Sequence, residues 1–249
     1  MEFTIEETGP APRRPDAFAE TRWSLVAAVQ DGSRSGRESL AELCQAYWYP
    51  VFAYVRRCGH APEIAYELTQ SFFAYLLAEL RDARPQEFGR FRNFLLARLN
   101  RFLVQDRHQP APAHEGCALP APPALSEVEQ RQQRELVPDA TPERAFQRSF
   151  ALELLAHGLI RLRQEASEGG RIAMFERLEP YLTNEPGPGQ YEVLAQAFGT
   201  RPLAVVIAIK RLRHRFRELV DAELAQTVAS GAELDAERDA LLSILGRGA

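Results

Sequence analysis

A basic segment near the C-terminus carries the residues whose types and spacing best fit a chemical task. The segment reads GTRPLAVVIAIKRLRHRFR from Gly199 to Arg217, and it follows the short amphipathic run YEVLAQAF. At about 100° per residue, its apolar positions form one helical stripe. The stripe consists of Val205, Ile209, Leu212, Phe216 and Leu219. The other faces carry cations and no acid, namely Arg201, Lys210, Arg211, Arg213, Arg215 and Arg217.

A packed inner stripe with a basic exterior suits a helix that lies against nucleic acid. The alternative is a solvated basic helix whose cations pair with an acidic neighbour. The whole chain has a net charge of −4, so any contact with nucleic acid must be local. Three scattered cysteines give no disulfide framework, and no run approaches the length of a membrane span. We therefore expect a cytoplasmic protein without membrane insertion.

Residue patterns for catalysis are missing from the sequence. The histidines have no HExxH spacing, the cysteines form no CxxC pair, and no phosphate-binding loop or nucleophile elbow occurs. Cys44, Cys58 and His60 would begin a zinc site if they met in the fold, but a buried thiol and a loop histidine are the commoner arrangement. We therefore expect no enzyme, no metal and no cofactor.

Helical periodicity dominates the chain and predicts an all-α fold of two small helical domains joined by a proline-rich linker. The C-terminal domain is expected to be a helix-turn-helix. The expected units are a disordered leader over 1–19, a first domain over 20–108, a flexible linker over 109–141, a second domain over 142–223 and a C-terminal helical extension over 224–249.

Within the first domain, local signals place the helices at about 21–30, 35–57, 61–80 and 90–107. Pro50 lies inside the second of these, so we expect a kink or a break there. The linker contains one candidate short helix, which Ser126 would cap. Thr141 followed by Pro142 is a cap with a proline at the first helical position, and it predicts the next helix.

Five segments occur in an order that is similar to a known family. They are YWYPVFAYVRRCGH (47–60), ELTQSFF (67–73), FGRFRNFLLARLNRFL (88–103), VQDRHQ (104–109) and finally LAQAFG…RLRHRFREL. This order resembles bacterial RNA polymerase sigma factors of the extracytoplasmic-function subfamily, over about residues 21–226. The resemblance implies a first domain that binds core RNA polymerase and the opened −10 element, and a second domain that reads the −35 element of promoter DNA.

The resemblance assigns the −10 strand to a basic helix. Seven arginines and three acids lie between Arg81 and Arg107, which is a local charge of +4 (7 − 3). The expected inner stripe is Phe91, Leu95, Leu99 and Phe102. The expected −10 contacts are Arg90, Arg92, Asn93, Asn100 and Arg107. The expected polymerase-binding residues are Glu67, Gln70 and Ser71, with Phe73 in the core. The family usually has acids where this chain has Ile64 and Ser71, so this face should attract a basic partner less strongly or serve another partner.

For the −35 element, the resemblance and the helical count place eight residues on the DNA-facing side. They are Arg201, Leu203, Val206, Ile207, Lys210, Arg211, Arg213 and Arg217. Lys210 and Arg211 would reach base edges, and the other arginines would bind phosphates. The three apolar residues would touch thymine methyl groups, or would be covered by a regulator when DNA is absent.

The sequence thus predicts a non-catalytic sigma factor whose partners are core RNA polymerase and promoter DNA. An anti-sigma factor, a regulatory kinase or the C-terminal extension would restrain it. A first alternative is a stand-alone helix-turn-helix regulator that binds duplex DNA as a dimer. A second alternative is a sigma-like adaptor that works through protein–protein contact.

Overall fold

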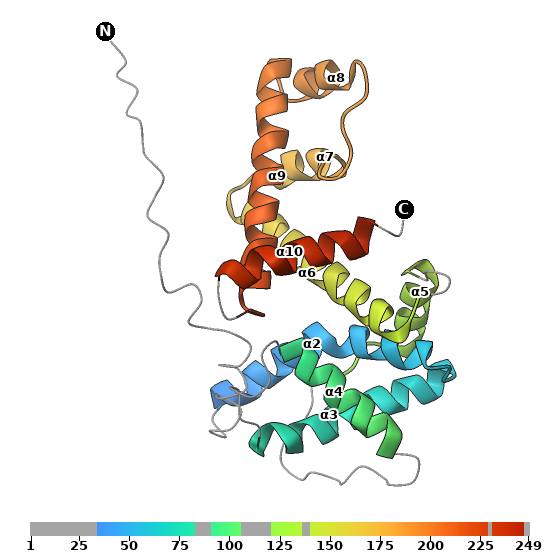
Figure 1. Cartoon of the computed structure of the whole chain (residues 1–249). Helices are drawn as coiled ribbons and strands as arrows, with labels where there is room; N and C mark the ends of the chain where they lie inside the picture. The colour runs from blue at the N-terminus through green and yellow to red at the C-terminus, as the bar shows by residue number, and fades with distance from the viewer. Residues whose placement is uncertain (1–33, 83–90, 106–120, 136–139, 229–230, 247–249) are drawn as a thin grey trace.

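Every secondary-structure element in the described part of the chain is helical, which confirms the all-α class. The computed structural model describes residues 34–82, 91–105, 121–135, 140–228 and 231–246, so the expected leader and the helix over 21–30 lie outside it. Within these ranges no single helix has the length and apolar character of a membrane span, although α8 and α9 together meet both criteria across a 94° bend. With the labels of Figure 1, the elements are α2 (Arg34–Arg57), α3 (Pro62–Asp82), α4 (Phe91–Gln105), α5 (Leu125–Glu135), α6 (Pro142–Glu168), α7 (Ile172–Leu178), η3 (Glu179–Tyr181), α8 (Gln190–Ala197), α9 (Pro202–Ala225) and α10 (Gly231–Gly246).

Aromatic side chains build the first core, between α2, α3, α4 and the start of α6. Tyr47 of α2 stacks on Phe150 of α6 at 5.3 Å between ring centroids, and Phe91 of α4 lies 5.4 Å from the same tyrosine. The helix α2 continues through Pro50 to Arg57, so of the expected kink or break the break does not occur. Proline is accepted there although it removes one backbone donor, because the surrounding apolar run is buried.

The helix α6 belongs to both parts of the molecule. Thr141 caps it, since its Oγ accepts a hydrogen bond from the backbone N–H of Arg144 at 3.2 Å, as the sequence predicts. Its first half contributes Phe146 and Phe150 to the first core, whereas Leu162 packs with α7 and α9 in a separate cluster. The boundary between the two hydrophobic clusters therefore lies in the middle of α6. It does not lie at residue 142, where the amino-acid composition changes. Figure 1 shows α6 running from the α2–α4 group to the α7–α9 group.

The described part of the expected linker packs against the first core. The helix α5 buries Val128 in that core, and the hydroxyl of Tyr66 in α3 donates to the carbonyl of Pro123 at 3.0 Å. The guanidinium of Arg131 lies 3.8 Å from the ring centroid of Tyr49 and also pairs with Glu153 of α6. Burial and the nearby charge of Glu135 raise the pKa of the Tyr49 hydroxyl.

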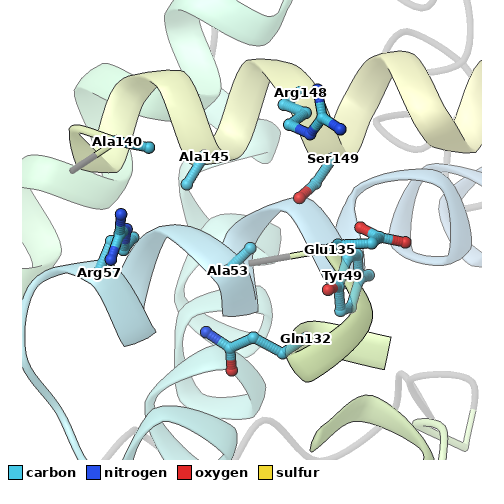
Figure 2. Close-up of a pocket in the computed structure, with 9 residues that line it drawn as sticks. All are labelled: Tyr49, Ala53, Arg57, Gln132, Glu135, Ala140, Ala145, Arg148 and Ser149. Carbon is cyan, nitrogen blue, oxygen red and sulfur yellow. The ribbon is translucent and has the colours of Figure 1, made fainter. Parts of the chain in front are cut away.

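A small cavity marks the place where α2, α5 and α6 meet. It has a volume of about 30 Å³, close to the space taken by one water molecule. Figure 2 shows Tyr49 and Ala53 from α2, Gln132 from α5, and Arg148 and Ser149 from α6 around this space. The close fit of the three helices shows that α5 is an integral part of the first core rather than a free tether.

Replacing Phe150 with alanine tests whether α6 belongs to the first core. We expect Phe150→Ala to lower the free energy of unfolding by about 3–5 kcal/mol, because it leaves a cavity beneath the ring of Tyr47. Chemical denaturation followed by circular dichroism measures this change. The matched control is Ile160→Ala in the same helix, whose side chain is 62% exposed and which should change stability by less than about 0.5 kcal/mol. Equal effects of the two substitutions would contradict the shared role of α6.

Candidate nucleic-acid interface

The helices α8 and α9 form a corner of defined geometry. They bend by 94° across a short turn, in which Gly199 has φ +62°, a conformation that favours glycine. The N–H of Thr200 donates to the carbonyl of Ala195 at 2.9 Å, and the N–H of Gly199 donates to Gln196 at 3.2 Å. This pair of bonds is the Schellman arrangement that ends a helix, and Pro202 then starts α9 at a position that needs no donor.

The inner stripe of α9 packs as predicted. Val205 and Ile209 are buried against Leu178 and Ala195, and Leu219 is buried with Leu162 of α6 in the next cluster. The opposite side carries exposed apolar groups at its start, because Leu203 is 69% exposed and Ile207 is 43% exposed. Val206 is half-buried between these two faces. The first turns of α9 thus present an apolar surface to solvent.

Four of the expected DNA-binding cations lie free on the exposed surface around α9. Arg201, Lys210, Arg211 and Arg217 are all exposed, and within the described ranges no hydrogen bond or ion pair occupies their charged groups. Three of them lie along α9 and the fourth immediately precedes it. The surface therefore combines apolar groups at the start of the helix with cations further along it.

Arg213 faces the protein, so its assignment as a phosphate contact needs correction. Its side chain is only 19% exposed. Its Nε donates to the carbonyl of Tyr181 at 2.8 Å, one terminal nitrogen donates to Asn184 at 2.7 Å, and the other pairs with Glu185. The hydrogen bond from Arg213 holds the pKa of the Glu185 carboxyl below its usual range. Arg213 thus fixes the loop that leads into α8.

Arg215 also forms ion pairs with acidic side chains, which corrects the expectation of a uniformly basic exterior. Its guanidinium pairs with Glu165 of α6 at 2.6 Å and with Glu218 at 2.9 Å. The hydrogen bonds that Arg215 donates to these carboxylates raise its pKa, and the bonds to Glu165 lower the pKa of that carboxyl. The alternative of an acidic neighbour therefore holds for this part of the helix, while the earlier turns stay basic.

Two arginines of α9 are expected to contribute differently to stability, because Arg213 contacts the protein and Arg217 is exposed. We expect Arg213→Ala to lower the free energy of unfolding by about 2 kcal/mol, because two backbone carbonyls lose a charged donor. Arg217→Ala should change it by less than about 0.5 kcal/mol, because its side chain is exposed. Urea denaturation of the two variants gives the comparison, and a neutral Arg213→Ala variant would refute the structural role.

The helix α4 has the predicted inner stripe, and Phe94 extends it. Phe91, Leu95, Leu99 and Phe102 are buried. Asn93 and Asn100 are exposed, and the Oδ1 of Asn100 accepts a hydrogen bond from the hydroxyl of Tyr54 at 2.5 Å. Burial, together with the charge of Glu143, raises the pKa of Tyr54 to about 12, so this hydroxyl stays protonated as a donor.

Arg92, one of the expected −10 contacts, is covered in this structure and not exposed to solvent. It is 7% exposed, and its guanidinium pairs with the carboxylate of Glu237 in α10. Glu237 of α10 thus covers the guanidinium of Arg92. The expected contacts Arg90 and Arg107 lie outside the described residues.

The expected polymerase-binding residues lie together on α3. Glu67 is exposed, Gln70 and Ser71 are half-buried, and Phe73 is buried as predicted. Gln70 borders a cavity of about 570 Å³, and part of its wall comes from Pro122 and Pro123. The segment before α5 therefore lies beside this face of α3.

No side-chain cluster that would hold a metal ion occurs among the described residues. Cys44 is buried and Cys58 is exposed at the end of α2. In the described ranges, no three residues of the types His, Cys, Asp and Glu come together in a ligand geometry.

Comparison of the chain with models of protein families, with curated proteins and with solved structures finds no match.

Proposed function

We propose that the protein is a promoter-recognition subunit of the sigma-factor type, which binds core RNA polymerase and directs transcription initiation in the cytoplasm. The observation that carries the proposal is the α8–α9 corner, with a buried inner stripe and exposed cations on the outer side of its second helix. A corner of about 90–120° is the geometry that inserts a second helix into the major groove. The order of segments in the first domain supports the same function.

On this proposal α9 reads duplex DNA with its first three turns. Lys210 and Arg211 donate to base edges, while Arg201 and Arg217 bind phosphates on the two sides of the groove. Leu203 and Ile207 are exposed, and thymine methyl groups would fit against them. A contact that excludes water would favour the burial of both side chains. Arg213 contributes indirectly, because it holds the loop that positions α8.

Removing the two base-reading cations tests this assignment. We expect Lys210→Ala with Arg211→Ala to abolish −35-dependent transcription and to leave binding to core polymerase unchanged, because both residues are exposed on α9 and far from α3 in the sequence. Removal of Arg201 or of Arg217, which bind phosphates on this proposal, should by contrast reduce the salt slope of DNA binding by about 0.9 for each residue. Reconstituted transcription and polymerase co-purification are the two measurements.

The matched control for this variant removes two exposed arginines elsewhere. Arg134 lies in α5 and Arg144 lies near the start of α6, and both are exposed. The double alanine variant at these positions loses the same charge and should keep −35-dependent transcription. If the Lys210 and Arg211 variant also failed to bind polymerase, the proposed division of labour between the domains would be wrong.

The face of α3 would bind the polymerase on this proposal. Glu67 is an exposed acid of this face, as is Glu63 one turn before it, and Ile64, which is 48% exposed, lies beside them. We expect Glu67→Lys to weaken binding to core polymerase about tenfold, since it reverses a charge toward a basic partner. Glu168→Lys, at the exposed end of α6, makes the same charge change and should bind normally. Pull-down titration with core enzyme measures both, and equal affinities would place the polymerase contact elsewhere.

A sigma-like adaptor is the second candidate function, and the exposed apolar side chains favour it. Leu203 on α9 and Ile64 on α3 each expose about half or more of their surface, which suits protein–protein contact as well as DNA contact. Run-off transcription with purified core enzyme separates the candidates. Polymerase binding without any promoter-specific product would favour the adaptor.

A further inference from the structure

The C-terminal helix α10 touches α4 through a buried ion pair. One terminal nitrogen of Arg92 lies 2.5 Å from Glu237 Oε1, and the other donates to Oε2 at 2.7 Å. The side chains are only 8% and 1% exposed. A guanidinium binds either a carboxylate or a phosphate through such close contacts between its nitrogens and the anion's oxygens. The guanidinium of Arg92 also lies 5.9 Å from the ring of Phe150.

Other contacts hold α10 in this position. Leu241 is buried in the first core, and Arg238 pairs with Asp221 near the end of α9 at 2.8 Å. Figure 1 shows α10 crossing α6 between the two helical groups. The Arg92–Glu237 pair, which reaches α4, spans 145 residues of sequence. The helix therefore bridges α4, α6 and α9.

The charges of the two helices are complementary. The described range of α10 contains four acids and one arginine, Arg238, whereas α4 contains three arginines and no acid. An acidic segment is attracted to a basic helix electrostatically, as a negatively charged nucleic-acid strand is. A carboxylate and a phosphate also present similar oxygen pairs to a guanidinium.

We propose that α10 is an intramolecular competitor of single-stranded DNA, in which the carboxylate of Glu237 occupies Arg92 at the place where a phosphate binds. This inference rests on the proposed function, because it concerns the basic helix assigned to the opened strand. Arg92 contacts DNA only after α10 leaves α4. The apparent affinity for a single strand is then reduced by the fraction of molecules in which α10 is displaced. By reciprocity, a bound strand favours the displaced position of α10.

The test uses the full chain with Glu237→Gln, which keeps the shape of the side chain and removes its charge. The probe is a fluorescent single-stranded DNA of 20 mixed-sequence nucleotides, and the readout is fluorescence anisotropy at fixed salt. We expect the variant to bind this strand about tenfold more tightly than the unmodified chain, because the occupied fraction of Arg92 falls. Amide hydrogen exchange should rise over α10 and stay low over α3.

The matched control is Asp235→Asn on the same helix. Its carboxylate is 75% exposed and, among the described residues, pairs with Arg238 in the neighbouring turn. The control removes the same charge, so it measures the general electrostatic gain, which should be small. The double variant Arg92→Gln with Glu237→Gln should release α10 and lose the tenfold gain. If the double variant kept the gain, Arg92 would not be the contact, and the proposal would be overturned.

Two further results would also overturn the proposal that α10 competes with single-stranded DNA. One is an affinity gain of Glu237→Gln that equals the gain of the control. The other is faster exchange over α10 with no gain in affinity, which would make the ion pair purely structural. If circular dichroism shows that Glu237→Gln does not fold, Glu237→Asp replaces it. The shorter side chain loosens the contact of the carboxylate with Arg92 and should give a smaller gain in affinity in the same direction.

The outcome is separable from that of the proposed function, because single-strand binding is measured without polymerase. A gain in strand binding without any binding to core polymerase would support the competitor and contradict the sigma-type function. Polymerase binding and −35 reading by the unmodified chain, with no gain for Glu237→Gln, would do the reverse.

Discussion

The close crossing of α6 and α9 at Gly158 is the constraint on which the arrangement of the helices depends. A Cβ atom there would lie 2.7 Å from Val220 Cγ2 and 3.3 Å from a ring carbon of Phe216, so a side chain would force the helices apart. The helix α6 is continuous from the first core to the turn before α7. The crossing at Gly158 therefore fixes the position of α9 relative to the first core. It also sets the position of α10, which follows α9 and packs on both helices.

Charged groups lie at the seams between helices rather than in the centres of the cores. Arg131 joins α5 to α6 through Glu153, and Arg92 joins α4 to α10. Desolvation offsets much of the attraction in such pairs, so their net contribution to the free energy of unfolding is small. Apolar packing tolerates several relative positions of two helices, whereas a buried ion pair with a directional hydrogen bond tolerates fewer. We infer that these pairs select the arrangement that the apolar contacts stabilise.

Local patterns in the sequence predict the helices and their buried faces, because periodicity and capping act over a few residues. The stripe of α9 and the cap at Thr141 are examples. Partners from distant segments leave no such local signal. Arg92 lies about 100° from Phe91, at the edge of the apolar stripe, and only the arrival of α10 decides that it is buried. Arg213 is held mainly by backbone carbonyls of an irregular loop, whose directions no residue pattern specifies.

The two candidate nucleic-acid surfaces differ in their accessibility, and this difference constrains the order of events in the proposed function. On α9, Lys210 and Arg211 are exposed to solvent. On α4, Arg92 is already occupied by a carboxylate. An encounter with DNA would therefore begin at α9, where no internal contact has to break. The opened strand would compete with Glu237 only afterwards, when binding at α9 has raised its local concentration near α4.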